Sequence, residues 1–98
     1  MLNTKIKIQE IKEGDYGWIK KLFNRRWGSD FIVTRGRVYT IDKLNGYIAK
    51  VDNKRVGLIT YKIRKDELEI VSLDSLLQKR GVGTKLVKKV IDMAREKN

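Results

Sequence analysis

The segment Gln78–Thr84 contains the residue types that are best suited to binding phosphate. Two glycines let its backbone approach a ligand closely, a basic pair precedes the first glycine, and a threonine hydroxyl follows the second. A helical pattern of apolar residues comes next, and the first turn of a helix offers about four unpaired N–H groups and about half a positive charge. This spacing predicts an anion site. Its candidate members are Gln78, Lys79, Arg80, Gly81, Val82, Gly83 and Thr84.

Two glycines at this spacing also have a simpler explanation, which is a turn that only starts a helix. The segment is not a P-loop, because no Gly-Lys-Ser/Thr follows four residues after a first glycine. It is not a dinucleotide fingerprint either, because a third glycine is absent and the preceding strands are expected to be antiparallel. The glycines alone therefore leave the choice between a phosphate site and a structural turn open.

The chain contains no Cys and no His, which limits the chemistry that it can perform. Disulfides, thiolate nucleophiles, Ser-His-Asp triads and most hydrolytic metal centres are excluded. Acid–base chemistry must then use carboxylates, Tyr, Lys or water. We expect no metal site, and we expect a reducing compartment, most simply the cytoplasm.

The net charge of +11, from 23 Lys and Arg against 12 Asp and Glu, indicates an attraction to anions. Nucleic acid, an acidic membrane surface and a polyphosphate cofactor are candidate partners, although Lys-rich surfaces are also common without a functional meaning. A length of 98 residues, 41% of them apolar and 36% charged, predicts one small globular domain. No apolar run reaches the ~20 residues that span a bilayer, and Met1–Glu10 lacks the hydrophobic block of a secretory signal.

Alternating apolar and polar residues predict four strands, and helical spacing predicts two helices. The strands are expected at Lys5–Ile11, Tyr47–Val51, Val56–Arg64 and Glu67–Leu73, and the short turns between the last three imply an antiparallel meander. Asp15 is expected to cap the first helix, and the second helix is expected to begin near Thr84. The segment Gly28–Leu44 is ambiguous, with one candidate short strand at Phe31–Val33.

Each predicted helix has an apolar stripe that would face a core. In the first helix the stripe consists of Trp18, Ile19, Leu22, Phe23 and Trp27. In the second helix it consists of Leu86, Val87, Val90, Ile91 and Ala94. We expect both tryptophans to be core residues, with the lining of a pocket as the alternative.

In this setting of strand, loop and helix, Gln78–Thr84 resembles the Gln/Arg-x-x-Gly-x-Gly/Ala signature of the GNAT superfamily of N-acetyltransferases. Glu69–Ser75 resembles the central strand of the same fold. Arg26–Gly28 and Thr34–Arg37 are similar to segments of a group of uncharacterised bacterial and archaeal GNAT proteins. The resemblance covers most of residues 1–98, as a single partial domain. It implies an α+β fold with a mixed, mostly antiparallel sheet and the element order β-α-(loop or short helix)-β-β-β-α.

The resemblance implies an acetyl-CoA-dependent N-acetyltransferase, which moves an acetyl group from the coenzyme A thioester to an amine. Residues that match Gln78–Thr84 would hold the coenzyme A pyrophosphate, mainly through the backbone amides of Lys79–Thr84. The strand that contains Val71 and Leu73 would pair with the pantetheine arm, through backbone groups that a bulge frees from the neighbouring strand.

The general base in this family is usually a carboxylate on the central strand. By this resemblance Glu69 is the first candidate and Glu67 the second, and Asp74 is a further option. Alternation along a strand puts Glu67 and Glu69 on one face. The competing explanation is that both are exposed cross-strand partners of basic residues such as Lys62 or Arg64.

One departure from the family pattern concerns the acceptor side. Family members continue past the second helix with a strand, a helix that often bears a tyrosine acid, and a hairpin, whereas this sequence stops at Asn98. We expect a truncated form with a cofactor loop and an incomplete acceptor site, and the acceptor amine is not identified. The alternative is a non-catalytic basic module for nucleic acid or another polyanion, which the scattered basic residues disfavour. An uncovered edge on the last strand also predicts a homodimer through strand pairing.

Overall fold

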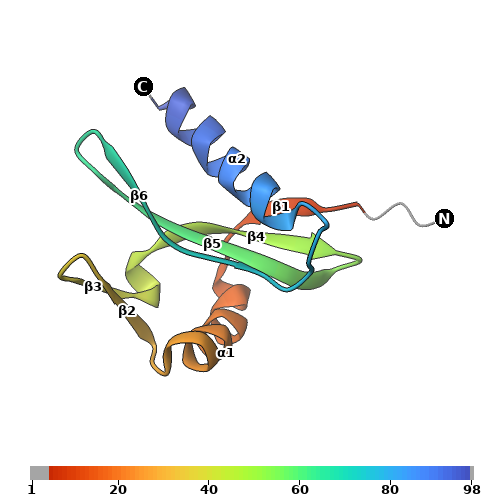
Figure 1. Cartoon of the computed structure of the whole chain (residues 1–98), viewed down its shortest axis with the longest axis horizontal. Helices are drawn as coiled ribbons and strands as arrows, with labels where there is room; N and C mark the ends of the chain where they lie inside the picture. Colours follow the sequence, from red (N-terminus) through yellow and green to blue (C-terminus); the bar gives the residue numbers. More distant parts are fainter. Residues whose placement is uncertain (1–4, 98) are drawn as a thin grey trace.

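The computed structural model describes residues 5–97, which form two α-helices, six strands and two short 3-10 helices (Figure 1). The helices are α1 (Tyr16–Trp27) and α2 (Val82–Glu96), and the 3-10 helices are Glu13–Asp15 and Ile41–Lys43. The predicted α+β class is confirmed, because the strands and helices follow one another in the expected order. No helix in this described range is long and apolar enough to cross a membrane.

Four strands form one sheet in the order β1-β4-β5-β6, and every neighbouring pair is antiparallel. Their bounds are β1 (Lys7–Glu10), β4 (Asn45–Val51), β5 (Lys54–Arg64) and β6 (Glu67–Ser75). The predicted meander of the last three strands is therefore present, joined by two-residue turns. β6 is an edge strand among the described residues, because it pairs with β5 alone.

The ambiguous segment between α1 and β4 forms a second, two-stranded hairpin of β2 (Phe31–Thr34) and β3 (Arg37–Thr40). The candidate strand at Phe31–Val33 is confirmed, whereas β3 was not predicted. Arg35 and Gly36 form the turn with φ angles of 54° and 74°. Two positive φ angles are typical of a tight hairpin turn, but Arg-Gly is a weaker signal for it than Asn-Gly or Asp-Gly.

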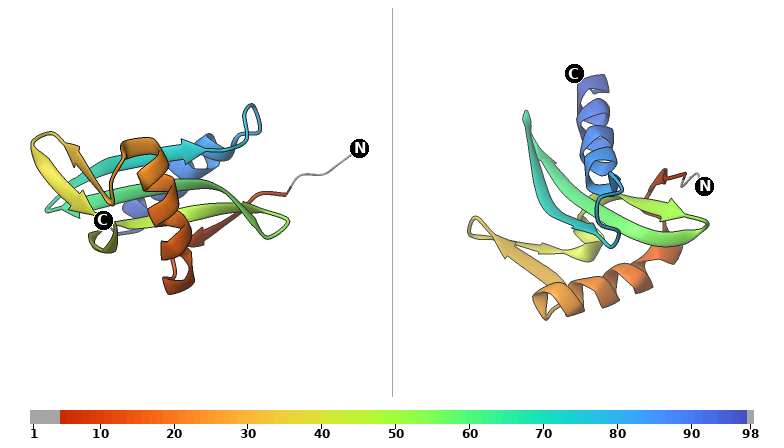
Figure 2. Two further views of the ribbon diagram at one scale, coloured as in Figure 1. Left: turned by 90° about the horizontal axis from the view of Figure 1, so that it is seen from below. Right: turned by 45° about the vertical axis from the view of Figure 1, so that its right-hand side comes forward.

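The sheet is the middle layer of the molecule, with α2 on one face and α1 with the β2–β3 hairpin on the other (Figure 2). Alternation along β4 and β5 supplies both cores, because neighbouring residues point to opposite faces. The α2 side contains Tyr47, Ala49, Val56, Ile59, Tyr61, Val82, Leu86, Val90 and Met93. The α1 side contains Ile19, Leu22, Phe23, Ile32, Tyr39, Leu44, Ile48 and Leu58. On the α2 side, burial raises the pKa of Tyr61 from 10.0 to about 12.

The regular pairing of β5 with β6 is interrupted at Val71. Thr60 pairs with Ser72 and Tyr61 pairs with Ile70, so Val71 is an extra residue in β6. The hydroxyls of Thr60 and Ser72 lie 2.6 Å apart beside this bulge. A bulge bends its strand and leaves a residue outside the ladder of hydrogen bonds. The structure thus has a bulge in the strand where the family resemblance implied one.

The prediction that Trp27 is a core residue is wrong, because its side chain is 52% exposed. Trp27 is the last residue of α1, and Gly28 then ends the helix in a left-handed conformation with φ 74°. The end of the helix therefore extends past the apolar layer. Trp18 is half-buried and packs against the α1-side core.

Two details of the helix ends also differ from prediction. Asp15 precedes α1 but makes no side-chain capping bond to it; its carboxylate accepts from the backbone N–H of Lys12 (2.8 Å) and from Nε of Arg55 (3.0 Å). α2 begins at Val82, two residues before the predicted start. Its buried stripe runs through Leu86, Val90 and Met93, which leaves Ile91 40% exposed at the flank.

Gly57 allows the first turn of α2 to lie directly on β5. A Cβ atom at this position would lie 2.5 Å from Cγ1 of Val82 and 3.1 Å from Cδ1 of Leu86. We expect Gly57→Ala to lower the free energy of unfolding by about 1–3 kcal/mol, as overpacking does in cores. Urea denaturation measures this change. Gly17→Ala is the matched control, since a Cβ there meets nothing within 4 Å. An unchanged unfolding midpoint for Gly57→Ala would contradict the close approach.

Candidate functional site

The loop between β6 and α2 borders a hollow with a volume of about 380 Å³. Gly81 stands immediately before α2 in a left-handed conformation with φ 75°. Because glycine has no side chain to cap the helix, the first N–H groups of α2 are available to a ligand. The hollow is lined by Ser75, Leu77, Gln78, Lys79, Gly81, Val82, Gly83 and Thr84. It brings together all the predicted loop residues except Arg80.

Open space and a basic residue lie together in this loop. A Cβ atom at Gly81 or Gly83 would meet nothing within 4 Å, so the space beside both residues is open. Lys79 also has a positive φ of 58°, which is uncommon for a residue with a side chain. Backbone donors, open space and a basic side chain in one turn fit a pyrophosphate group.

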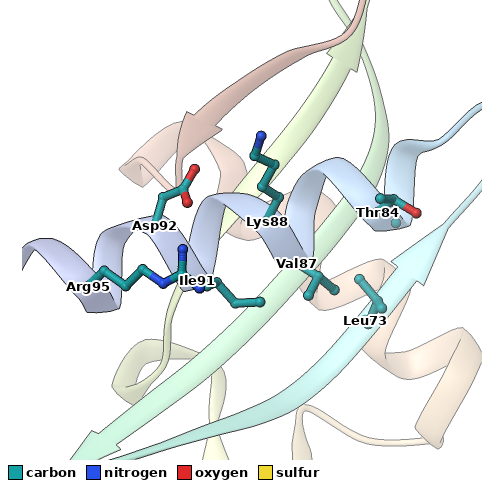
Figure 3. A pocket seen from close by; sticks show the side chains of 8 residues that line it. Leu73, Thr84, Val87, Lys88, Ile91, Asp92 and Arg95 are labelled. Atoms are coloured by element: carbon teal, nitrogen blue, oxygen red, sulfur yellow. The ribbon is translucent and has the colours of Figure 1, made fainter.

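A second, larger groove runs along α2 beside β6, with a volume of about 690 Å³ (Figure 3). Its lining consists of Leu73, Gly83, Thr84, Val87, Lys88, Ile91, Asp92 and Arg95. Gly83 and Thr84 border both the hollow and the groove, so the two are adjacent. The apolar floor includes Leu73 and Ile91, which are 45% and 40% exposed. The arrangement suits a ligand with an anionic end and a less polar arm.

The predicted strand residues Val71 and Leu73 have side chains in different places. Leu73 lines the groove beside α2. Val71, at the bulge, packs against the core on the α1 side of the sheet. Val82 is 1% exposed and belongs to the α2-side core, so only its backbone can serve a ligand.

Glu69, the first candidate for the general base, is held by residues of another element. Its Oε1 accepts a hydrogen bond of 2.6 Å from the hydroxyl of Tyr39, a buried residue of β3. Nη2 of Arg64 donates to the same hydroxyl at 3.3 Å, and the guanidinium lies over the ring, 5.6 Å from its centroid. Nη1 of Arg37 lies 3.9 Å from Oε1 of Glu69. The carboxylate side chain is 12% exposed and has a fixed orientation.

The competing explanation made Glu67 and Glu69 cross-strand partners of Lys62 or Arg64. The strand pairing agrees with it, but Lys62 and Arg64 hydrogen-bond to other groups. Glu69 pairs with Lys62 and Glu67 pairs with Arg64 along the ladder. The side chain of Lys62 instead donates to the carbonyl oxygen of Lys43 at 3.1 Å, and Arg64 donates to Tyr39. Glu67 is exposed at the start of β6.

The further option, Asp74, is engaged in an ion pair across layers. Its Oδ1 lies 3.1 Å from Nε of Arg26 in α1, and its side chain is 11% exposed. This pair ties the end of β6 to the last turn of α1. Asp74 therefore has a structural partner that accounts for its burial.

Tyr39 and Arg37 are the residues near Glu69 that the sequence did not point to, and Arg64, expected only as a cross-strand partner, contacts Tyr39 instead. Tyr39 lies 30 positions before Glu69, and only the folding of the hairpin onto the sheet brings them together. The sequence offered one signal for this contact: Ile32 and Tyr39 are apolar positions in a segment that otherwise carries basic residues, so their side chains were candidates for burial. That pattern does not indicate which strand they face.

The fold is a small α+β arrangement with a glycine-containing loop at the start of a helix and a carboxylate on a bulged strand. A profile of the acetyltransferase (GNAT) family matches residues 10–98. The chain therefore belongs to the GNAT acetyltransferase family, as the signature at Gln78–Thr84 indicated.

Two relatives from Bacillus subtilis (strain 168) match the chain. The uncharacterized protein YxbD is 41% identical over 81 residues, which cover 82% of this chain and 51% of YxbD. The uncharacterized protein YdhI is 32% identical over 74 residues, which cover 74% of this chain and 46% of YdhI. The chain thus spans about half the length of these relatives. No solved structure gives a significant match.

Proposed function

We propose that this chain carries the coenzyme-binding part of an N-acetyltransferase that transfers an acetyl group from acetyl-CoA to an amine. The observation that carries the proposal is the hollow at the start of α2, where the family signature supplies uncapped backbone donors and two glycines with open space. Membership in the GNAT family supports an acyl-transfer activity.

In this proposal the pyrophosphate of the coenzyme lies in the hollow, and the arm of the coenzyme runs from there to the unpaired edge of β6. Backbone N–H groups of Lys79–Thr84 hold the pyrophosphate, with Gln78 at the start of the loop and the side chains of Lys79 and Arg80 adding positive charge. Backbone groups of Val71–Leu73, next to the bulge, bind the pantetheine arm. When bound, acetyl-CoA supplies an acetyl thioester that reacts with the amine.

Glu69 is proposed to accept the proton that the amine loses as it attacks the thioester carbonyl. The C–N bond forms as the C–S bond breaks, and the coenzyme leaves as its thiolate or thiol. A base must be held within reach of its proton, directly or through one water. The contact from Tyr39 fixes the Glu69 carboxylate two residues before the bulge.

An amide-resolved NMR titration with coenzyme A tests the binding half of this proposal. We expect saturable shifts at Lys79–Lys85, with half-saturation below millimolar ligand. Adenosine 3′,5′-bisphosphate and pantetheine are useful fragments, because pantetheine alone should shift Leu73 and leave Lys79 unchanged. Amides of Lys79–Lys85 that do not move at millimolar coenzyme A would refute the cofactor claim.

Two partner hypotheses accompany this proposal. The non-catalytic alternative, a basic module for nucleic acid or another polyanion, rests on the net charge of +11 and predicts salt-sensitive binding to a random duplex. A homodimer through the unpaired side of β6 is a competing hypothesis, since open strand edges favour pairing with another chain and the coenzyme arm would use the same edge. Sedimentation across a concentration range tests the dimer. A cytoplasmic location is proposed from the absence of Cys and His in the sequence.

A further inference from the structure

The surroundings of Glu69 carry more positive charge than one carboxylate requires. Arg37 of β3 and Arg64 of β5 both approach the Tyr39–Glu69 pair. Lys62 is the cross-strand neighbour of Glu69, although its Nζ donates to a backbone carbonyl. Two guanidinium groups therefore lie beside the Tyr39–Glu69 pair, and Lys62 stands opposite Glu69 in the strand ladder. A single ion pair for Glu69 would need only one of them.

The two guanidinium groups keep donor capacity after their contacts with the protein. Arg37 approaches Glu69 at 3.9 Å, which is longer than a hydrogen bond, and its side chain is 51% exposed. Arg64 is exposed and donates one N–H to the Tyr39 hydroxyl. A guanidinium has five N–H donors in a planar fork. Both groups can therefore bind an anion from solvent while Glu69 stays in place.

We propose that Arg37 and Arg64 bind an anionic group of the acceptor, a carboxylate or a phosphate, and so select amines that carry such a group near the reacting nitrogen. The inference rests on the proposed transferase function, because it assigns Glu69 as the base that the amine must reach. Arg37 and Arg64 come from the hairpin and the sheet, so the packing of Tyr39 sets their spacing. They are specificity-determining residues in this proposal.

Electrostatics favours an anionic acceptor over a polycationic one. An amine must be neutral to attack a carbonyl, and nearby guanidinium groups disfavour its ammonium form. A second ammonium, as in a polyamine, would be repelled by the same groups. A carboxylate or phosphate instead gains charge-assisted bonds, for which the planar fork of arginine is well suited.

The test compares acceptors in pairs with and without the anionic group, and each rate is referred to the concentration of free amine, because the anionic group also changes the pKa of the amine. Glycine and glycinamide, β-alanine and β-alaninamide, and O-phosphoethanolamine and ethanolamine are assayed with acetyl-CoA by release of free thiol. We expect at least one anionic member to exceed its neutral partner by about tenfold or more in kcat/KM. The carboxylate and phosphate pairs show which anion is preferred. Neutral members that react as well as or better than every anionic partner would overturn the inference.

Arginine variants locate the preference on the protein. Arg37→Gln and Arg64→Gln should each bring the ratio between anionic and neutral acceptors close to one. Arg35→Gln removes the same charge from the turn of the hairpin and should leave the ratio unchanged. Arg37 is the more informative position, because its half-exposed side chain can be replaced without opening the core. Equal losses for Arg35→Gln and Arg37→Gln would mean that overall charge alone sets the preference, and would refute the site.

Direct binding separates this inference from the proposed function. Each acceptor is titrated into the complex with coenzyme A, and the amides of residues 37–39, 64 and 69 are followed by NMR. Anionic ligands that shift these amides more than their neutral partners support the anion site even if no amine is acetylated, in which case the transferase proposal fails alone. Equal shifts for both members of every pair overturn the inference while leaving coenzyme binding untouched.

Discussion

Replacement of Glu69 by Gln is expected to lower kcat/KM for amine acetylation by about 10²–10⁴-fold, the range in which a general base contributes. Gln keeps an oxygen that can accept the 2.6 Å hydrogen bond from Tyr39, so the packing between β3 and β6 is retained. It cannot accept a proton from the amine. We therefore expect the loss to appear in kcat, with unchanged affinity for coenzyme A. Initial rates and isothermal titration calorimetry measure the two quantities.

Glu67→Gln distinguishes the two candidate bases. Glu67 is exposed at the start of β6, and it lies two residues further from the bulge than Glu69. We expect this variant to retain its rate within about threefold, as surface substitutions away from a site do. A large loss for Glu67→Gln together with a small loss for Glu69→Gln would reverse the assignment. Small losses for both would exclude the two glutamates as the base and leave Asp74 as the remaining carboxylate candidate on β6.

The strand, loop and helix around Gly81 could be predicted from sequence because the signals there are local. Helical spacing after the loop, alternation before it and two glycines between them all lie within one short stretch. The antiparallel meander was predictable for the same reason, since its turns at Asp52–Asn53 and Lys65–Asp66 are short and polar. The predicted bounds of these elements differ from the structure mainly at the element ends, as at the start of α2, where tertiary contacts decide which residues belong to the helix.

The surroundings of Glu69 could not be predicted, because they depend on contacts between distant segments. The hydrogen bond from Tyr39 requires the hairpin turn at Arg35–Gly36 and the packing of Ile32 against the sheet. Sequence alternation placed Glu69 on a face but did not show what covers that face. The exposure of Trp27 has a related cause, because helical spacing does not show where the apolar layer ends. The local sequence pattern thus predicts the candidate coenzyme loop around Gly81, whereas tertiary packing creates the surroundings of Glu69.

Replacement of Gly83 by Asp is expected to weaken coenzyme A binding by about 100-fold or more. The new carboxylate would occupy the open space beside the second residue of α2, where the pyrophosphate is proposed to bind. Two unit charges of like sign at about 4 Å repel by about 4 kcal/mol in an effective dielectric of about 20. An acidic residue in the first turn of a helix stabilises the fold, typically by about 0.3–1 kcal/mol. Folding and binding should therefore change in opposite directions, which excludes misfolding as the cause of lost affinity.

Gly17→Asp is the matched control, because Gly17 is the second residue of α1 as Gly83 is of α2. A Cβ atom at either glycine meets nothing within 4 Å, so both substitutions are sterically tolerated. Both variants should keep or slightly raise the midpoint of urea unfolding, and only Gly83→Asp should lose affinity for coenzyme A. Since the two variants have the same net charge, a comparable loss in both would show that coenzyme A responds to the overall charge of +11. In that event the loop at α2 would be a structural turn, and the proposed pyrophosphate site would be wrong.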